Sequence, residues 1–474
     1  MPIQDMQNYL IKNISIVNEG RIITSDVLVK NNRIEKIAAN IQPSIQVREI
    51  DGEEKYLLPG VIDDQVHFRE PGLTHKGSIY TESRAAVAGG ITSFMEMPNT
   101  IPPAFSQELL EKKYEIGSVS SLANYSFFMG TSNDNTDEVL RTNEKKKEVC
   151  GIKIFMGSST GNLLVDNYLT LDKLFRETEL LIATHCEDEK VIKKNLERLK
   201  LEKAELGASD HPLIRDEQAC FESSLTAIQF AKKYNSRLHI LHLTTEKEMQ
   251  LFSNMVPLAE KRITAEVCVH HLHFTSDDYA KLGNQIKCNP AIKAPHNREA
   301  LWKALLDDRL DVIATDHAPH TMEEKGFFRN TDGCLSPLPG ENGSYQKAHA
   351  GLPLVQHALL LMLYYVQKGK ISIEKVAEKM SHAVATCFRI NQRGFIREGY
   401  FADLVIVDMH RTTAIDNQNI LYKCGWSPME SCRGNNAGTL FPAAITHTFV
   451  NGHLVYGNET FDESQRGHRL SFDR

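Results

Sequence analysis

Apolar residues in the middle of the chain gather in short runs that alternate with longer, helix-like segments. Six of these runs predict buried strands: ITSFMEMP, GIKIFMG, LLIATHCE, RLHILHLTT, ITAEVCVHH and LDVIATDHAPH. Between them lie segments typical of helices, such as LTLDKLFRETE, ACFESSLTAIQFAKKYN and NREALWKALLDD. Alternation of strands and helices favours a parallel sheet. Because polar residues stand at the ends of most of these strands, residues 59–395 are predicted to form a (β/α)8 TIM barrel, whose active site lies at that rim.

The two ends of the chain show a different pattern, with short β-rich runs bounded by turn residues. In the first part, the alternation in DVLVKNNRIEKI predicts a hairpin that turns at Asn31 and Asn32. In the last part, ITHTFVNGHLVYG contains Asn451 and Gly452 as a tight turn. We therefore expect a small flanking β-sandwich domain formed by both chain termini, residues 1–58 and 396–474.

Composition favours a soluble protein of the cytoplasm. The chain has 474 residues and a net charge of −7, which argues against nucleic acid or an acidic membrane as partner. Its nine cysteines occur singly, without a C-x-x-C pair, and this suits a reducing compartment. The first residues lack a basic segment followed by an apolar run, so no signal peptide is predicted. The longest apolar stretch, GLPLVQHALLLMLYYVQ, is too short for a membrane span and predicts a buried helix.

Five residues that bind metals or require a charge partner stand at the ends of predicted strands: His67, Lys153, His185, His242 and Asp316. A single histidine in such a place is more often structural than a ligand. A lysine within an apolar strand is harder to explain by packing, because an unpaired buried ammonium is costly. Together the five predict one site of imidazole nitrogen and carboxylate oxygen, which suits zinc with an open position for water.

Several motifs follow one another in the order and rough spacing of the amidohydrolase superfamily: GVIDDQVHFREPG, MPNT, GIKIFMG, ATHCE, LHLTT, TAEVCVHHL, NPAIK and ATDHAPH. Within that superfamily the combination resembles the dihydroorotases, which interconvert N-carbamoyl-L-aspartate and L-dihydroorotate in pyrimidine synthesis. HFREPG and DHAPH are the most specific motifs, whereas the late GYFADLVIVD belongs to the superfamily generally. The resemblance covers nearly the whole chain and implies a hydrolase that acts on a small cyclic amide. We also expect a homo-oligomer, either a dimer or a tetramer.

The resemblance implies a role for each of the five strand-end residues. Lys153 would be carboxylated and would bridge two zinc ions. His185 and His242 would bind the more exposed metal, while His67 and Asp316 would bind the more buried one. Asp316 would also act as general base and then as general acid. The chemistry is consistent, because a desolvated lysine has a lowered pKa and its free amine can react with carbon dioxide.

The same resemblance implies a set of residues that recognise the substrate. Arg69 and Asn99 would bind its free carboxylate, since a guanidinium holds a carboxylate by two parallel hydrogen bonds. The remaining contacts would come from Asn289, His320 and the backbone of Ala350 and Gly351. His239 and His317 match no ligand position and are interpreted as structural, and HPLIRDEQ has no predicted role. The segment after His320 is long, polar and rich in glycine and proline, as lids and binding loops often are.

Gln65 departs from the commoner family pattern, in which two histidines are separated by one residue. Its amide oxygen is neutral and matches zinc less well than an imidazole does. His67, Asp316 and the carbamate of Lys153 would still supply three good ligands. We therefore expect one firmly bound zinc ion at the other site and a second position that is partly filled or empty.

Three alternatives to a dihydroorotase are open at this stage. Allantoinase and dihydropyrimidinase share the fold and the metal site. The pair of Arg69 and Asn99 favours a substrate with a free carboxylate, which dihydropyrimidinase substrates lack. A non-catalytic scaffold related to these enzymes is the third alternative. Such relatives usually lose several metal ligands, and this chain retains Lys153, His185, His242 and Asp316.

Overall fold

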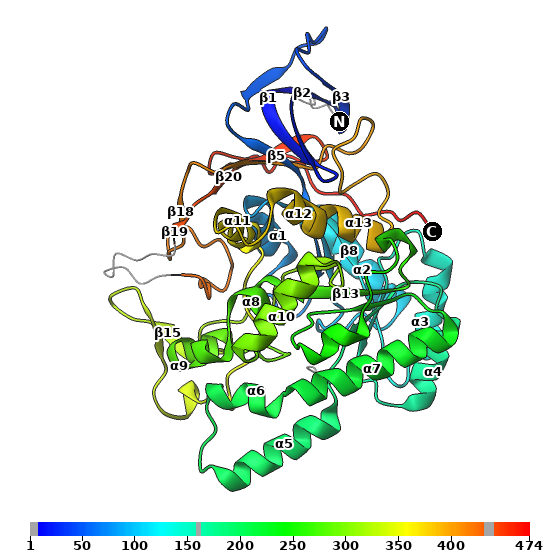
Figure 1. Cartoon of the computed structure of the whole chain (residues 1–474), viewed down its shortest axis with the longest axis vertical. Helices are drawn as coiled ribbons and strands as arrows, with labels where there is room; N and C mark the ends of the chain where they lie inside the picture. Colours follow the sequence, from blue (N-terminus) through cyan, green and yellow to red (C-terminus); the bar gives the residue numbers. More distant parts are fainter. Residues whose placement is uncertain (1–7, 158–162, 431–439) are drawn as a thin grey trace.

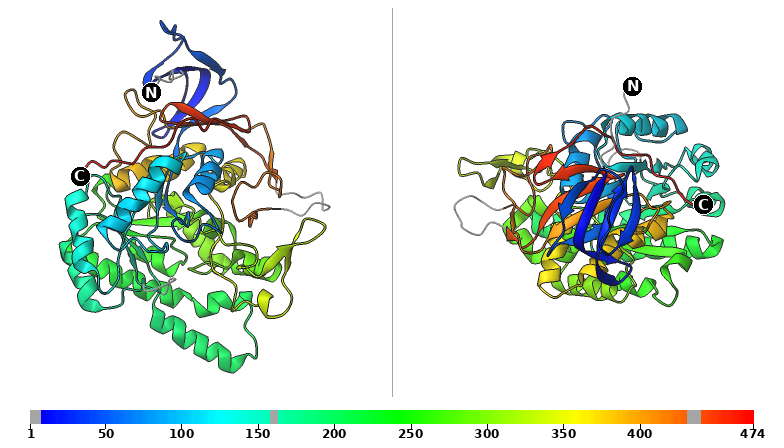
Figure 2. Two further views of the ribbon diagram at one scale, coloured as in Figure 1. Left: turned by 180° about the vertical axis from the view of Figure 1, so that it is seen from behind. Right: turned by 90° about the horizontal axis from the view of Figure 1, so that it is seen from above.

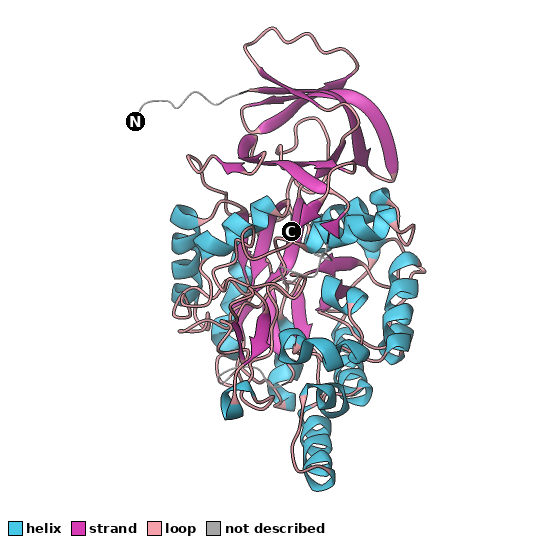
Figure 3. Cartoon of the chain, turned by 90° about the vertical axis from the view of Figure 1, so that its left-hand side faces the viewer, coloured by secondary structure: helices cyan, strands magenta, loops and turns pink. Residues whose placement is uncertain are grey.

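A barrel of parallel strands surrounded by helices forms the centre of the protein (Figures 1 and 3). The computed structural model describes residues 8–157, 163–430 and 440–474. Two parallel sheets make up the barrel, one in the order β6-β7-β8 and one in the order β9-β10-β11-β12-β13-β14. Their strands are β6 (Val61–Val66), β7 (Ile91–Glu96), β8 (Asn124–Phe127), β9 (Met129–Gly130), β10 (Ile152–Phe155), β11 (Ile182–His185), β12 (Leu238–Ile240), β13 (Ile263–Cys268) and β14 (Val312–Ala314).

Backbone hydrogen bonds close the barrel where the two sheets meet. The amide of His67, just after β6, donates to the carbonyl of His317, just after β14, at 2.7 Å. At the other junction, β8 and β9 are separated only by Phe128, whose amide donates to the carbonyl of Glu96 at 3.0 Å. The predicted barrel is therefore confirmed. Strand β8, which pairs with β7 in parallel, was not among the predicted strands.

Helices cover the outside of the barrel, and several begin at side chains suited to that position. Asp188 and Asp216 accept hydrogen bonds from the first turns of α5 and α7, each at 2.9 Å, as capping residues do. The helices are α1 (Ile79–Ala88), α2 (Gln107–Ser120), α3 (Thr136–Leu140), α4 (Tyr168–Glu177), α5 (Glu189–Glu202), α6 (His211–Ile214), α7 (Glu217–Tyr234), α8 (Val269–His273), α9 (Tyr279–Leu282), α10 (Pro295–Leu306), α11 (Ala358–Gln367), α12 (Ile373–Ala377) and α13 (Ala383–Phe388). Helix α11 is buried as predicted, although it begins seven residues after Gly351.

Strands from both ends of the chain share one sheet, which Figure 2 shows from above. Its order is β22-β21-β20-β17-β5-β1-β2-β3, and β4 pairs with β1. Tyr9 of β1 makes an edge contact with Phe449 of β20, with ring centroids 5.1 Å apart, although two strands separate them in this order. The sheet therefore folds over a core of its own. Its strands are β1 (Tyr9–Asn18), β2 (Arg21–Lys30), β3 (Arg33–Ala38), β4 (Arg48–Asp51), β5 (Tyr56–Pro59), β17 (Leu404–Asp408), β20 (Ala444–Val450), β21 (His453–Gly457) and β22 (Thr460–Phe461).

Both predicted hairpin turns are present in this sheet. Asn31 and Asn32 join β2 to β3, and Asn451 and Gly452 join β20 to β21. Both Asn31 and Asn451 have a positive φ, which asparagine and glycine tolerate in tight turns. After β22 the chain returns to the barrel, where the amide of Leu470 donates to the carbonyl of Tyr125 at 2.9 Å.

Two short ribbons and their loops complete the described structure. Strands β15 (Phe327–Arg329) and β16 (Leu335–Pro337) lie in the long segment that follows β14. Strands β18 (Thr413–Ala414) and β19 (Leu440–Phe441) pair with each other beside the barrel. Among the helices in the described ranges, none combines the length and the apolar character needed to cross a bilayer. The prediction of no signal peptide concerns the first residues of the chain, and residues 1–7 lie outside the described residues.

Candidate active site

A cavity of about 790 Å³ opens at the C-terminal ends of the barrel strands. Each residue predicted to bind a metal or the substrate lines it, and Gln65 does so too. The predicted residues in its wall are His67, Arg69, Asn99, Lys153, His185, His242, Asn289, Asp316, His320, Ala350 and Gly351. Seven different barrel strands or the segments that follow them therefore bring these side chains together from distant parts of the sequence.

Lys153 projects from β10 and is almost completely buried. Its Nζ has no hydrogen-bond partner among the described residues, and it lies 4.6 Å from the centroid of the Phe155 ring. Burial lowers the pKa of Lys153 to about 7, although the charge of Asp316 works in the opposite direction. Near neutral pH the side chain is therefore to a large extent a free amine, the form that reacts with carbon dioxide.

His185 and His242 meet at the same wall of the cavity. Nδ1 of His185 lies 2.9 Å from Nε2 of His242, and Nδ1 of His242 is buried without a hydrogen-bond partner among the described residues. Burial lowers the pKa of both imidazoles, so both are neutral at physiological pH. A neutral imidazole is the form that binds metals.

Glu187 and Arg215 support this histidine pair from behind. Nε2 of His185 lies 3.0 Å from Oε2 of Glu187, and the Arg215 guanidinium pairs with the same oxygen. Burial would raise the pKa of Glu187, but the charge of Arg215 and the hydrogen bond with His185 outweigh it and lower the pKa to about 2. Sequence reasoning missed both residues. Glu187 stands two positions after His185, and this spacing was the available signal.

His67 and Asp316 form the second pair, where the barrel closes between the ends of β6 and β14. Nε2 of His67 lies 3.1 Å from Oδ1 of Asp316, while its Nδ1 lies 2.7 Å from the Asn99 amide oxygen. Gln65 donates its amide hydrogen to the same Asp316 oxygen at 3.1 Å. The Gln65 amide oxygen faces the Cys268 thiol, with the two heavy atoms 3.8 Å apart. Gln65 therefore holds the Asp316 carboxylate with its nitrogen and does not turn its oxygen toward it.

Arg69 lies buried at the rim of the cavity, beyond His67. Its Nε donates to the carbonyl of Pro319 at 3.1 Å, and its Nη2 lies 3.1 Å from Nε2 of His320. Glu324 lies on the far side of the His320 ring, with its Oε2 at 3.2 Å from Nδ1. Burial lowers the pKa of Arg69 to about 10, so the guanidinium is still charged at neutral pH. The site thus offers a fixed positive charge where a substrate carboxylate could bind.

Asn289, Ala350 and Gly351 close the cavity from the other side. The Asn289 amide oxygen lies 3.0 Å from Nε2 of His211, which also contacts the carbonyl of Cys288 at 2.8 Å. The amide of Gly351 donates to the carbonyl of Lys287 at 2.9 Å. HPLIRDEQ, for which the sequence gave no role, therefore brings His211 to Asn289 and Arg215 to Glu187.

The two histidines interpreted as structural do not line the cavity. His239 lies inside the barrel, with Nε2 at 3.1 Å from Asp64 and 3.5 Å from Glu266. His317 pairs with Glu82 at 2.9 Å, and its carbonyl accepts the amide of His67. Both residues anchor the walls that carry the predicted ligands.

Three of the predicted site residues adopt left-handed backbone conformations: Arg69 with φ 74°, His242 with φ 39° and Asp316 with φ 49°. Few residues other than glycine occupy this region, because the side chain crowds the backbone. Such strained positions gather at sites where the surrounding structure holds a side chain for a purpose. Here they aim three charged or ligating groups into one cavity.

The donor groups of the cavity fit a metal centre. The predicted ligands form two pairs: the charge of Asp316 in one pair acts on Lys153, and the charge of Lys153 acts on both histidines of the other pair. Between these pairs the Lys153 nitrogen is buried without a hydrogen-bond partner among the described residues. In the described ranges, tighter groups of three candidate ligands also occur elsewhere: Asp64, His239 and Glu266, and Cys268, His270 and His271.

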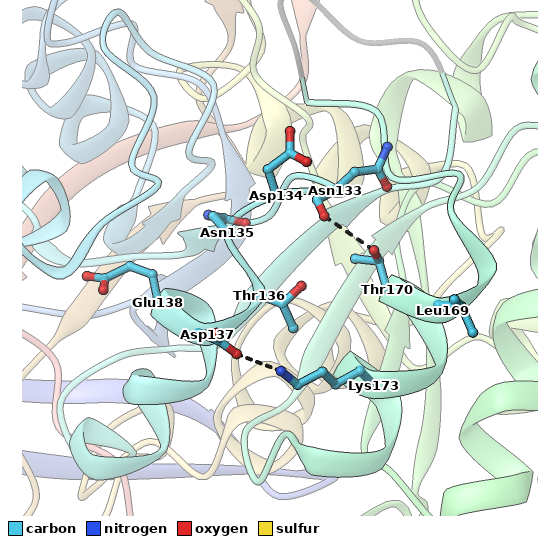
Figure 4. A pocket seen from close by; sticks show the side chains of 9 residues that line it. All are labelled: Asn133, Asp134, Asn135, Thr136, Asp137, Glu138, Leu169, Thr170 and Lys173. Carbon is cyan, nitrogen blue, oxygen red and sulfur yellow. Dashed lines mark hydrogen bonds and ion pairs between the residues drawn. The ribbon is translucent and has the colours of Figure 1, made fainter.

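A second pocket lies on the surface between α3 and α4 and is wide open to solvent (Figure 4). An ion pair between Lys173 and Asp137, at 2.6 Å, crosses it, and Thr170 donates to the carbonyl of Asn133 at 3.4 Å. It contains none of the residues predicted for the active site. Its walls are satisfied surface polar groups, so we assign it no chemistry.

Comparison with known proteins identifies the class to which this fold and cavity belong. The model of the amidohydrolase family matches residues 56–455. The chain belongs to the amidohydrolase family. It is 31% identical over 468 residues to a dihydroorotase of Methanosarcina acetivorans, covering 96% of this chain and 94% of that protein. It is 30% identical over 459 residues to a dihydroorotase of Pyrococcus abyssi, covering 95% and 96%. These similarities confirm the predicted resemblance.

Solved structures of related enzymes share the fold. An L-hydantoinase (dihydropyrimidinase) from Arthrobacter aurescens superimposes with a TM-score of 0.86 and 24% identity, covering 96% of this chain and 98% of that one. A dihydropyrimidinase from Brevibacillus agri superimposes with a TM-score of 0.84 and 22% identity, covering 99% and 100%. At this level of identity the likeness concerns the architecture alone.

Proposed function

We propose that this protein is a dihydroorotase, which reversibly hydrolyses the cyclic amide of L-dihydroorotate to N-carbamoyl-L-aspartate in pyrimidine synthesis. The buried guanidinium of Arg69 carries the proposal, because it supplies a fixed charge for the substrate's free carboxylate beside the His67–Asp316 pair. Asn99 supports it, since its oxygen holds His67 and its amide nitrogen makes no hydrogen bond within the described part of the chain. The full-length similarity to dihydroorotases adds an independent argument.

We also propose that the cavity holds zinc. His185, His242 and carboxylated Lys153 would bind one ion firmly, and His67 with Asp316 would bind a second ion less tightly. The orphaned nitrogens of Lys153 and His242 support this assignment. When bound, zinc would polarise the scissile carbonyl and acidify water at neutral pH.

The chain's own residues would then position the substrate and move one proton. Arg69 and Asn99 would hold the carboxylate and so fix the orientation of the ring. Asp316 would accept a proton from the attacking water and return it to the ring nitrogen that leaves. Gln65 and His67, both at 3.1 Å from its Oδ1, would keep that carboxylate in place.

The remaining predicted contacts surround the substrate from the far side. His320, held between Arg69 and Glu324, would contribute a neutral imidazole, since burial lowers its pKa. Asn289 and the backbone of Ala350 and Gly351 would offer hydrogen bonds to the ring. A cytoplasmic location and a homo-oligomeric state remain predictions from the sequence.

An enzyme of the hydantoinase or dihydropyrimidinase type is the second candidate, because solved structures of that type share the architecture. Their substrates lack the carboxylate that Arg69 would bind. The observations give less support to an allantoinase or to a non-catalytic scaffold. A scaffold would not need the predicted metal ligands to converge on one cavity.

A panel of substrates tests the proposal. The purified, zinc-supplemented protein is assayed with L-dihydroorotate, dihydrouracil, hydantoin and allantoin. We expect kcat/KM for dihydroorotate to exceed the others by on the order of 100-fold or more, as expected for a buried charge pair. Preference for dihydrouracil or hydantoin would favour the second candidate. Inactivity on all four, in protein with a normal zinc content, would favour the scaffold.

A further inference from the structure

A cluster of thiol and imidazole groups lies behind the cavity, where β13 passes into α8. Candidate ligand atoms of Cys268, His270 and His271 all lie within 4.8 Å of one another. The three side chains are at most 3% exposed. None of them lines the cavity or belongs to the ligand set proposed for catalysis. The cluster is therefore separate from the proposed active site and needs its own explanation.

The imidazole nitrogens of this cluster are poorly satisfied. The His270 ring has only a weak contact with the Thr315 backbone and no hydrogen bond of good geometry, and Nδ1 of His271 has no partner among the described residues. Nε2 of His271 lies 3.1 Å from the carbonyl of Pro290. Leaving a buried polar group unpaired is costly, because the hydrogen bonds it made to water are not replaced. By contrast, Nε2 of buried His317 pairs with Glu82, and its Nδ1 accepts from the backbone amide of Leu354 at 2.9 Å.

The charges around the thiol favour a cation. Sγ of Cys268 lies 3.4 Å from Oε1 of Glu266, and the carboxylates of Asp316 and Asp63 also act on it. Burial, together with these negative charges, holds the pKa of the Cys268 thiol well above its usual range. The same field that opposes a bare thiolate attracts a positive ion to this point. A bound divalent cation would supply the charge that the thiolate needs.

We propose that Cys268, His270 and His271 form a second metal site, distinct from the catalytic centre, that binds Zn²⁺ through one thiolate and two imidazoles. Sulfur and imidazole nitrogen are the ligands zinc prefers in structural sites. On binding, the Cys268 S–H bond breaks, the S–Zn bond forms, and one proton is released to solvent.

The geometry requires only a small contraction of the cluster. With Zn–S near 2.3 Å and Zn–N near 2.1 Å, neighbouring ligand atoms of a tetrahedral site lie about 3.6 Å apart. The present atoms lie within 4.8 Å, so rotations that move them by about 1 Å would close the site. Gln65 separates this site from the catalytic side, since its oxygen faces Cys268 and its nitrogen faces Asp316.

Cobalt spectroscopy tests the site without measuring activity. Metal-stripped protein is titrated with cobalt(II) chloride and its absorption is recorded. We expect a thiolate-to-cobalt charge-transfer band in the near ultraviolet, because the proposed catalytic ligands contain no sulfur. Cys268→Ser should remove this band, keep the visible absorption of the catalytic site and bind one ion fewer. Cys150→Ser, which changes another buried free thiol, is the matched control and should keep the band.

Two results would overturn the proposal. One is the absence of the charge-transfer band in the wild type at saturating cobalt, and the other is its persistence in Cys268→Ser. If Cys268→Ser fails to fold, zinc-edge X-ray absorption of the fully loaded wild type decides instead. A sulfur scatterer at about 2.3 Å would support the site, and a purely nitrogen and oxygen shell would exclude it. None of these measurements depends on which cyclic amide the enzyme hydrolyses.

Discussion

Lys153 shows most clearly how burial changes the reactivity of a single side chain. It lies buried in β10 without a hydrogen-bond partner among the described residues, and its pKa of about 7 favours the neutral amine, which can react with carbon dioxide. If its carbamate is a metal ligand, Lys153→Ala should lose nearly all activity, and a short-chain carboxylic acid in the buffer should restore part of it. Lys153→Arg should stay inactive, because a guanidinium remains protonated and forms no carbamate. Activity and zinc content are measured together, and full activity in Lys153→Ala would disprove the assignment.

Arg69 decides between substrates with and without a carboxylate. Arg69→Met should raise the barrier for dihydroorotate by about 2–5 kcal/mol, because a buried charge pair is lost. Zinc content should not change, since Arg69 contacts His320 and Pro319 and none of the proposed ligands. Arg84→Met, which breaks an ion pair with Glu463 on the surface of α1, is the matched control. An unchanged kcat/KM in Arg69→Met would indicate a substrate that lacks the carboxylate.

Gln65 should influence the relative zinc affinities of the two proposed metal positions. Its nitrogen bonds to Asp316, so in its present orientation it offers no oxygen to a metal held there. Gln65→His should raise the zinc occupancy of the position at His67 and Asp316, because it adds a nitrogen donor on an aligned strand face. Isothermal titration calorimetry, with zinc added to metal-stripped protein, measures both affinities. Two wild-type sites of equal affinity, unchanged by Gln65→His, would contradict this prediction.

At the scale of elements, the turn between α6 and α7 supports the histidine pair through Arg215, which lines the cavity. Arg215 in this turn pairs with Glu187, which in turn contacts His185. Carboxylates that orient metal-bound histidines typically contribute about 10–100-fold to metal affinity. Arg215→Met should therefore weaken zinc binding at His185 and His242 by a factor in this range.

A matched control for Arg215→Met lies on the neighbouring helix α5. Arg198 forms a solvent-exposed ion pair with Glu202, so Arg198→Met removes a charge without touching the histidines. Competition with a chromophoric chelator measures zinc affinity in both variants. Equal affinities would show that Arg215 does not position His185.

At the scale of the whole molecule, the barrel encloses a charged triad of His239, Asp64 and Glu266. Burial alone would lower the pKa of His239, but the two carboxylates outweigh it and raise the pKa to about 9. In the unfolded chain the pKa of His239 is about 6.5. The folded state therefore binds the imidazole proton of His239 more tightly than the unfolded state does. The resulting stabilisation is complete below pH 6.5 and is lost as the pH rises through 9.

Urea unfolding of metal-stripped protein checks this pH dependence. The advantage of the wild type over His239→Gln in free energy of unfolding should shrink by on the order of 3 kcal/mol between pH 6.5 and pH 9.5. The comparison with the variant removes the opposing contribution of Lys153, whose lowered pKa raises stability over the same range. His239→Gln should be less stable than the wild type at pH 6.5, because Asp64 and Glu266 lose their partner. A difference between the two proteins that does not change across this range would contradict the prediction.

The pattern of apolar residues was sufficient to predict the barrel, both hairpin turns and the helices α4, α7, α10 and α11, because burial on one or both faces leaves a local trace. It missed β8 (Asn124–Phe127), where polar Asn124 and Ser126 interrupt the apolar run. Both side chains can be buried because each has a hydrogen-bond partner outside the strand. Asn124 bonds to Asp403 at 3.2 Å, and Ser126 bonds to Tyr114 at 2.8 Å. Those partners lie far away in the sequence or on another element, so no local window contains them.

The sequence alone determined which side chains are present as candidate metal ligands and substrate contacts. The motifs carry the imidazoles, the lysine and the arginine, and the strand periodicity places them at one rim. Tertiary structure alone decided which groups are paired and which are left free. It turned the Gln65 nitrogen toward Asp316, placed Arg215 beside Glu187, and left Nδ1 of His271 without a partner among the described residues. These outcomes depend on distances between segments far apart in the chain, which periodicity does not encode.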